Sequence, residues 1–138
     1  MRILTTTLAI TLLCTTAVAP ALAQKAPSAA RETAPVVDPS GTFVDEYGTT
    51  FTFELCGDGT ALCGVLNELK GKSATEENLE YVGKQVMQAE QSAPNQWKGE
   101  LEAGGMSAEA TVTQVSPDTI EITGCRAILC QTLAYNRV

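Results

Sequence analysis

The chain has 138 residues, of which 9 are lysine or arginine, 16 are aspartate or glutamate and none is histidine, so its formal net charge is −7. This length allows one ordinary domain, and the lack of histidine excludes histidine-based triads and general bases and most zinc and haem sites. The acidic balance disfavours nucleic acid and anionic membrane surfaces, which require a positively charged binding face.

Residues 1–23 have the pattern of a cleaved export signal. A basic residue precedes an apolar stretch from Ile3 to Val18, and Ala21 and Ala23 supply the small residues that signal peptidase recognises. We therefore expect the mature chain to begin at Gln24. The apolar stretch is shorter than a membrane helix, which needs about 20 residues, so we expect no stable membrane anchor after cleavage.

The next segment, residues 24–40, is rich in alanine, proline, serine and threonine and poor in large apolar side chains. Such a composition buries too little apolar surface to offset the entropy of folding. We expect a disordered leader over these residues and a folded domain over residues 41–138.

Alternating apolar and polar residues indicate short strands in this domain. Between Thr49 and Cys56, the side chains of Phe51, Phe53 and Leu55 fall on one face. Other strands are expected at 42–44, 62–69, 82–89, 96–102, 106–115, 119–125 and 128–138. In the last of these, Leu129, Leu133 and Tyr135 are expected to share a face.

One connection differs from the others. Ser73 and Glu76 have the spacing of a capping box, which predicts a single helical turn over residues 74–80.

About eight short strands without a long helix predict an all-β fold, either a single antiparallel barrel or a sandwich. The barrel is favoured, because closure leaves no strand edge exposed.

Four cysteines fall in the predicted domain: Cys56, Cys63, Cys125 and Cys130. An even number in a small exported chain predicts two disulfides, for which three connectivities exist. Pairing of near neighbours is favoured, with crossed pairing as the alternative. The spacings C-x6-C and C-x4-C are not those typical of zinc sites, and the lack of a C-x-x-C motif favours structural over redox cysteines.

Residues 41–138 resemble the DUF2147 family of exported bacterial proteins, which are uncharacterised. The matching motifs, in chain order, are Gly41-Thr42-Phe43, Cys56-Gly57-Asp58 with Leu62-Cys63-Gly64, Val82-Gly83, Trp97-Lys98-Gly99 and Gln131-Thr132 with Arg137-Val138. Phe43 stands where the family has tryptophan.

The resemblance implies a lipocalin-like barrel of about eight strands. In such barrels a late arginine packs across an early aromatic ring and closes one end. Phe43 and Arg137 would form this pair, with a cation–π contact worth about 0.5–2 kcal/mol.

Several residue types are candidates for a functional site. Aromatic and methionine side chains would either fill the barrel or line a ligand cavity; they are Phe51, Phe53, Met87, Trp97, Met106 and Tyr135. Asp58 lies in a turn with too few oxygen ligands for calcium, and we expect no metal site. Glu100 and Glu102 share a strand face, where we expect them to be solvated. We expect no catalytic residues and no cofactor.

These patterns predict a non-enzymatic protein that is periplasmic or secreted by a bacterium and that binds a small apolar or amphipathic ligand. Cleavage of the signal removes Arg2 and leaves 8 basic and 16 acidic residues, a net charge of −8. This charge suits a basic protein partner, so an inhibitor of a basic cell-wall hydrolase is the first alternative, and an enzyme is the second. The sequence does not indicate the oligomeric state.

Overall fold

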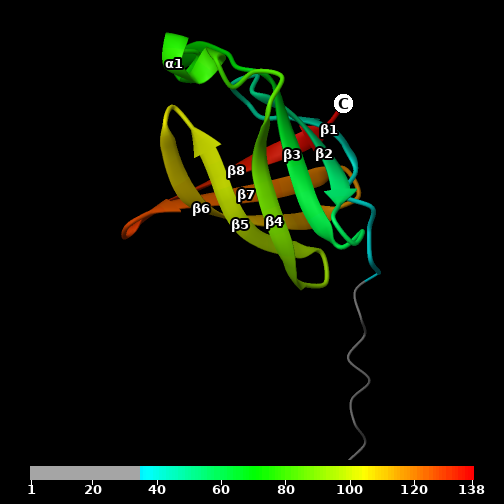
Figure 1. The fold of residues 1–138 in the computed structure, drawn as a ribbon. Coiled ribbons are helices and arrows are strands. Elements are labelled where there is room, and N and C mark those ends of the chain that lie inside the picture. Colours follow the sequence, from blue (N-terminus) through cyan, green and yellow to red (C-terminus); the bar gives the residue numbers. More distant parts are fainter. Residues whose placement is uncertain (1–34) are drawn as a thin grey trace, which may run out of the picture. The chain divides into compact units, whose positions relative to one another are not determined.

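The computed structural model describes residues 35–138 (Figure 1). The predicted signal peptide, its cleavage site and residues 24–34 of the predicted leader lie outside this range. Within residues 35–138, no helix is both long and apolar enough to span a membrane.

Eight antiparallel strands form a closed barrel in chain order. Their bounds are β1 Gly41–Val44, β2 Thr50–Cys56, β3 Ala61–Glu68, β4 Gln85–Ala93, β5 Gln96–Ala103, β6 Met106–Ser116, β7 Thr119–Arg126 and β8 Leu129–Arg137. The barrel closes where β1 pairs with β8, with Phe43 opposite Arg137 and Val44 opposite Asn136. The prediction of an all-β antiparallel barrel is confirmed, and the sandwich alternative is wrong.

The barrel has two unlike ends. At one end, which we call the closed end, the turns joining β2 to β3, β4 to β5 and β6 to β7 are short. At the other, which we call the mouth, lie the β1–β2, β5–β6 and β7–β8 turns and the long β3–β4 connection. That connection holds η1 (Gly71–Ser73) and α1 (Glu76–Leu79), and Figure 1 shows α1 beyond the tip of the β5–β6 hairpin.

The β3–β4 connection departs from its prediction in two ways. The N-cap of α1 is Thr75, whose side chain accepts a hydrogen bond from the Asn78 N–H, rather than Ser73. Strand β4 begins at Gln85 rather than at Val82. The preceding residues turn instead, since Gly83 has a positive φ of 82° and donates its N–H to the Leu66 carbonyl.

Inward-facing side chains from the strands build the core. The largest fully buried ones are Trp97, Phe43, Phe53, Leu62, Met87, Ile120 and Val112. Leu129 shares a face with Leu133 and Tyr135, as predicted. Neither Leu129 nor Leu55 reaches the core, however: Leu55 is 42% exposed and Leu129 is 76% exposed. Both lie near strand ends, where the alternation continues beyond the last packed layer of side chains.

Two glycines allow the strands to curl into so narrow a barrel. A Cβ on Gly99 of β5 would lie 1.9 Å from the Gln88 carbonyl oxygen of β4. A Cβ on Gly64 of β3 would lie 2.8 Å from the Phe53 ring. Glycine is therefore required at both positions for close approach of backbone to backbone and of backbone to ring.

The last residues of the predicted leader belong to the folded domain. The Val37 N–H donates to Asn95 Oδ1 at 3.0 Å, and Asn95 Nδ2 donates to the Pro35 carbonyl at 3.1 Å. Gln114 Nε2 donates to the Asp38 carbonyl at 3.2 Å. Residues 35–40 thus lie across the closed end, and the prediction of disorder up to Ser40 is wrong for these six residues because the barrel supplies partners for their backbone.

Candidate functional site

An arginine clamp seals the closed end. The Arg137 guanidinium carbon lies 4.5 Å from the centroid of the Phe43 ring, so the structure brings the two predicted closure residues together. The guanidinium also donates to the carbonyls of Pro117, Ser40 and Asp38. One acceptor lies in the β6–β7 turn and two lie in the N-terminal segment, so one side chain ties these two segments together.

Both disulfides join neighbouring strands. Cys56 pairs with Cys63 across β2 and β3, with a Cα–Cα distance of 5.9 Å. Cys125 pairs with Cys130, which lies directly opposite it in β7 and β8, with a Cα–Cα distance of 4.0 Å. The favoured local pairing is confirmed and the crossed alternative is wrong.

Asp58 has a structural role in the turn between the first two cysteines. Its Oδ1 accepts hydrogen bonds from the Thr60 hydroxyl at 2.6 Å and the Thr60 N–H at 3.0 Å, and these bonds lower the pKa of the carboxyl group. Among residues 35–138, no group of three or more carboxylate or cysteine side chains is arranged to hold a metal ion.

The six candidate cavity residues separate into three groups. Phe53, Met87 and Trp97 are fully buried in the core, and Trp97 Nε1 donates to the Thr60 carbonyl at 2.8 Å. Met106 is 52% exposed at the β5–β6 turn, so its placement inside the barrel was wrong. At this turn it borders a depression of about 250 Å³ together with Tyr81 and Glu102.

The remaining two, Phe51 and Tyr135, form the floor of an open cavity. Their ring centroids lie 5.6 Å apart, edge to face. Above them is a cavity of about 290 Å³ at the mouth, whose apolar walls are Leu66, Leu69, Val86, Leu101 and Leu133. Ser73 and Asn78, from the connection that carries η1 and α1, border the same cavity. We call this space the mouth cavity.

A second depression adjoins the mouth cavity. It is a groove of about 450 Å³ along the inner face of β7 and β8, and the two share the side chains of Leu101, Gln131, Leu133 and Tyr135. Gly124 lies in this groove, and a Cβ placed on it would meet no atom within 4 Å. The absence of a side chain at position 124 therefore leaves part of the groove open.

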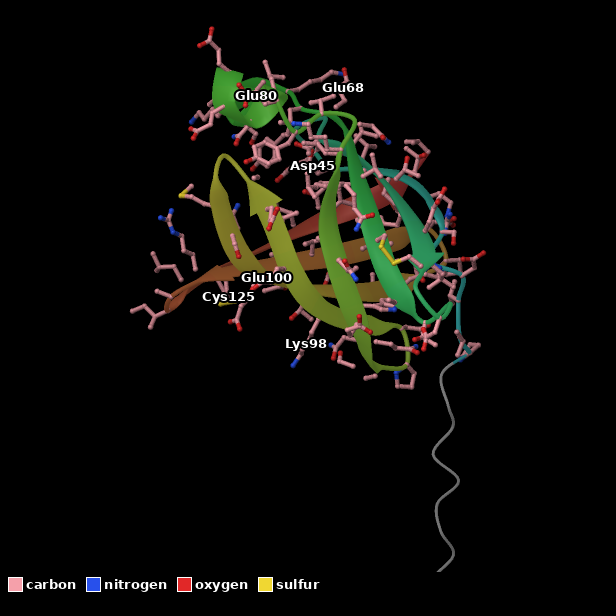
Figure 2. All side chains as sticks on the ribbon, viewed as in Figure 1. Asp45, Glu68, Glu80, Lys98, Glu100 and Cys125 are labelled. Carbon is pink, nitrogen blue, oxygen red and sulfur yellow. A yellow bond between two sulfur atoms is a disulfide. The ribbon has the colours of Figure 1, made fainter. Side chains whose placement is uncertain are left out.

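One buried carboxylate lies on the wall of the mouth cavity. Asp45 is only 7% exposed, and its Oδ1 accepts hydrogen bonds from the N–H groups of Tyr47 and Thr49 at 2.9 and 2.7 Å. In Figure 2 Asp45 lies on the same side of the barrel as Glu68 and Glu80, away from Lys98 and Glu100. The turn after β1 thus fixes a negative charge at the mouth.

Burial and the neighbouring Asp45 also change the pKa of the Tyr135 phenol. Burial raises the pKa of its phenol, and the nearby Asp45 carboxylate raises it further. The carboxylate on the cavity wall therefore lies beside a phenol at the floor that retains its proton.

Asp45 was missed in the sequence because it looked like an ordinary turn residue. Its signal was present: an aspartate directly after a strand, with glycine three positions later, is typical of a side chain that hydrogen-bonds to its own turn. What placed it at a cavity was the closure of β1 on β8.

Glu100 and Glu102 lie on the outer face of the barrel. Both are exposed and border a surface groove of about 420 Å³ together with Gln88 and Glu90 of β4. Glu100 also lies opposite Glu109 of β6. The like charges are solvated, and of the residues that line this groove only Val86 also lines the mouth cavity.

Comparisons with protein-family models, with curated proteins and with solved structures each found no match. The resemblance to the DUF2147 family therefore stays a prediction from the sequence motifs.

Proposed function

We propose that this protein is an exported, non-enzymatic β-barrel that binds a small apolar or amphipathic ligand at its mouth. The observation that supports this proposal is the contrast inside the barrel: large side chains fill the closed half, and an open cavity occupies the other. Small-molecule sites are typically concave, mostly apolar and equipped with a few fixed polar groups. The mouth cavity has this composition.

The cellular location is part of the same proposal. Two disulfides in a small domain are typical of proteins from oxidising compartments. Together with the signal-like residues 1–23, they support a periplasmic or secreted protein and membership of the DUF2147 family.

The test is to fill the groove without disturbing the fold. Gly124→Leu places a side chain in open space, and glycine in a strand interior adds little stability of its own. We expect this variant to fold as stably as the unaltered protein and to lose most of its binding of a neutral apolar probe such as N-phenylnaphthylamine, measured by fluorescence.

Glu121→Leu is the matched control, because it adds the same side chain to the exposed outer face of the same strand. Its probe binding should be unchanged. Equal probe binding by both variants and the unaltered protein, or no binding by any of them, would contradict the proposal.

A second function is favoured by the tip of the β7–β8 hairpin. Ile128 is 95% exposed there beside the exposed Leu129, and the Cys125–Cys130 disulfide holds the tip rigid. A preordered loop loses less entropy on docking, and the acidic charge suits a basic partner such as a cell-wall hydrolase. The test is whether the immobilised protein retains lysozyme. Retention at moderate salt that is lost in Ile128→Ser would support this function. No retention at low or moderate salt would exclude it.

A further inference from the structure

The mouth cavity is electrostatically one-sided. Of the side chains that line it, only Asp45 carries a formal charge. The adjoining groove contains one cation, Arg126, which lies exposed at the start of the β7–β8 turn. The inner end of the site is thus negative, and its one positive group lies at the outer end.

Asp45 has capacity for another donor. A carboxylate offers about four lone-pair positions, of which the backbone of the β1–β2 turn occupies two at Oδ1. The Tyr135 phenol also hydrogen-bonds to this carboxylate, which leaves about one position for a ligand donor. The two backbone bonds hold the side chain in place, so that binding a ligand would not require it to be reorganised. A fixed, largely buried carboxylate attracts a cation more strongly than an exposed one, because water screens it less.

Apart from the β7–β8 turn, which carries Arg126, the chain segments around the mouth are mostly acidic. The acidic residues of the β1–β2 turn, the β3–β4 connection and the end of β5 are Asp45, Glu46, Glu68, Glu76, Glu77, Glu80 and Glu102, and the basic ones are Lys70, Lys72 and Lys84. Two of the three lysines are partly engaged: Lys70 pairs with Glu68 at 3.1 Å, and Lys84 lies over the Tyr81 ring. The rim therefore carries a net negative charge that would draw a cation toward the cavity.

From this geometry we propose that the ligand is a cationic amphiphile: an apolar chain or ring system packed against Phe51, Tyr135 and Leu133, with an ammonium group that donates to the Asp45 carboxylate. This inference rests on the proposed ligand-binding function and specifies its ligand class. The apolar part supplies affinity by burial, and the charge-assisted hydrogen bond to Asp45 supplies selectivity.

Three probes with the same alkyl chain separate charge from apolar burial: octylammonium, octanol and octanoate, each measured by displacement of N-phenylnaphthylamine from the full mature chain. We expect octylammonium to bind about tenfold more tightly than octanol, since hydrogen bonds to charged groups are the stronger ones. Octanoate should bind most weakly.

Asp45→Asn is the decisive variant, because the amide oxygen can still accept the two turn hydrogen bonds while the charge is removed. We expect it to bind octanol as before and to lose the preference for octylammonium. Glu46→Gln removes one charge from the adjacent exposed residue and should keep the preference. A thermal unfolding curve for each variant checks that the turn remains folded.

The outcomes are distinguishable. Equal binding of octylammonium and octanol by the unaltered protein, or tightest binding of octanoate, would overturn the cationic ligand class. An unchanged preference for octylammonium in Asp45→Asn would overturn the role of Asp45 in recognising it. Each of these outcomes leaves the ligand-binding function standing. Failure of all three probes to bind would overturn both. If Asp45→Asn does not fold, the probe series on the unaltered protein decides the question by itself.

Discussion

The two ends of this barrel use the same strands for different purposes. At the closed end, Trp97, Phe43 and Phe53 fill the interior, and Arg137 and residues 35–40 cover it. At the mouth, Leu101 and Leu133 are only partly buried, and open space remains above Phe51 and Tyr135. The difference suggests that stability is concentrated in one half of the molecule and binding in the other, which substitutions at the two ends can test.

The largest expected difference is between two leucines. Leu62 is fully buried near the closed end, and Leu62→Ala should lower the free energy of unfolding by about 2–5 kcal/mol, because it removes contacts and leaves a cavity. Leu133→Ala at the mouth removes a partly buried side chain beside space that is already open, so the loss should be roughly 1 kcal/mol. Urea denaturation measures both, and similar losses would show that the mouth is packed as tightly as the closed end.

Two arginines provide the next comparison. Arg137→Ala loses the contact with Phe43 and three hydrogen bonds to carbonyls, and should cost about 2–3 kcal/mol. Arg137→Lys should recover only part of this, because an ammonium group cannot bridge several acceptors as a planar guanidinium does. Arg126→Ala, at the exposed hairpin, should change stability by less than about 0.5 kcal/mol. Equal costs at the two positions would contradict the role of Arg137 as a clamp.

The two disulfides should contribute similarly to stability but differently to binding. They close short loops, with sequence separations of 7 and 5, so replacing either pair with serine should cost about 2 kcal/mol in the loop-entropy model. Cys125 and Cys130 border the groove at the mouth, so their loss should also weaken probe binding. Probe binding that weakens only on loss of the Cys56–Cys63 bond would reverse the assignment of the two ends.

The smallest effect appears only in alkali. Because the pKa of Tyr135 is raised in the folded protein, its folded form holds the proton more strongly than the unfolded chain does. The resulting stabilisation is present below about pH 10, the ordinary pKa of tyrosine, and is lost as the pH rises above it. Tyr135→Phe should reduce this decline in stability, with little change at neutral pH. Urea denaturation across this pH range measures the free energy of unfolding of both proteins. An identical decline in the two would place the phenol outside the buried floor.

Local patterns predicted the strands well and the site only in part. The alternation around Phe51 and Phe53 assigned their face correctly, since the period of a strand is a local property. The same pattern did not show that Leu55 and Leu129 are exposed, because alternation does not reveal where the packed layers end. Asp45 was not identified as a site residue, since its place beside Tyr135 depends on pairing between the first and last strands.

The sequence by itself determined the strand-rich architecture, the favoured local pairing of cysteines and, through the family resemblance, the pair Phe43 and Arg137. These features depend on residues close together in the chain or on motifs read directly from it. Only the tertiary structure decided which half of the barrel is filled and which is open. That outcome depends on strand register around the whole barrel: glycines at positions 64 and 99 bring strands and rings into close contact, whereas glycine at position 124 faces open space.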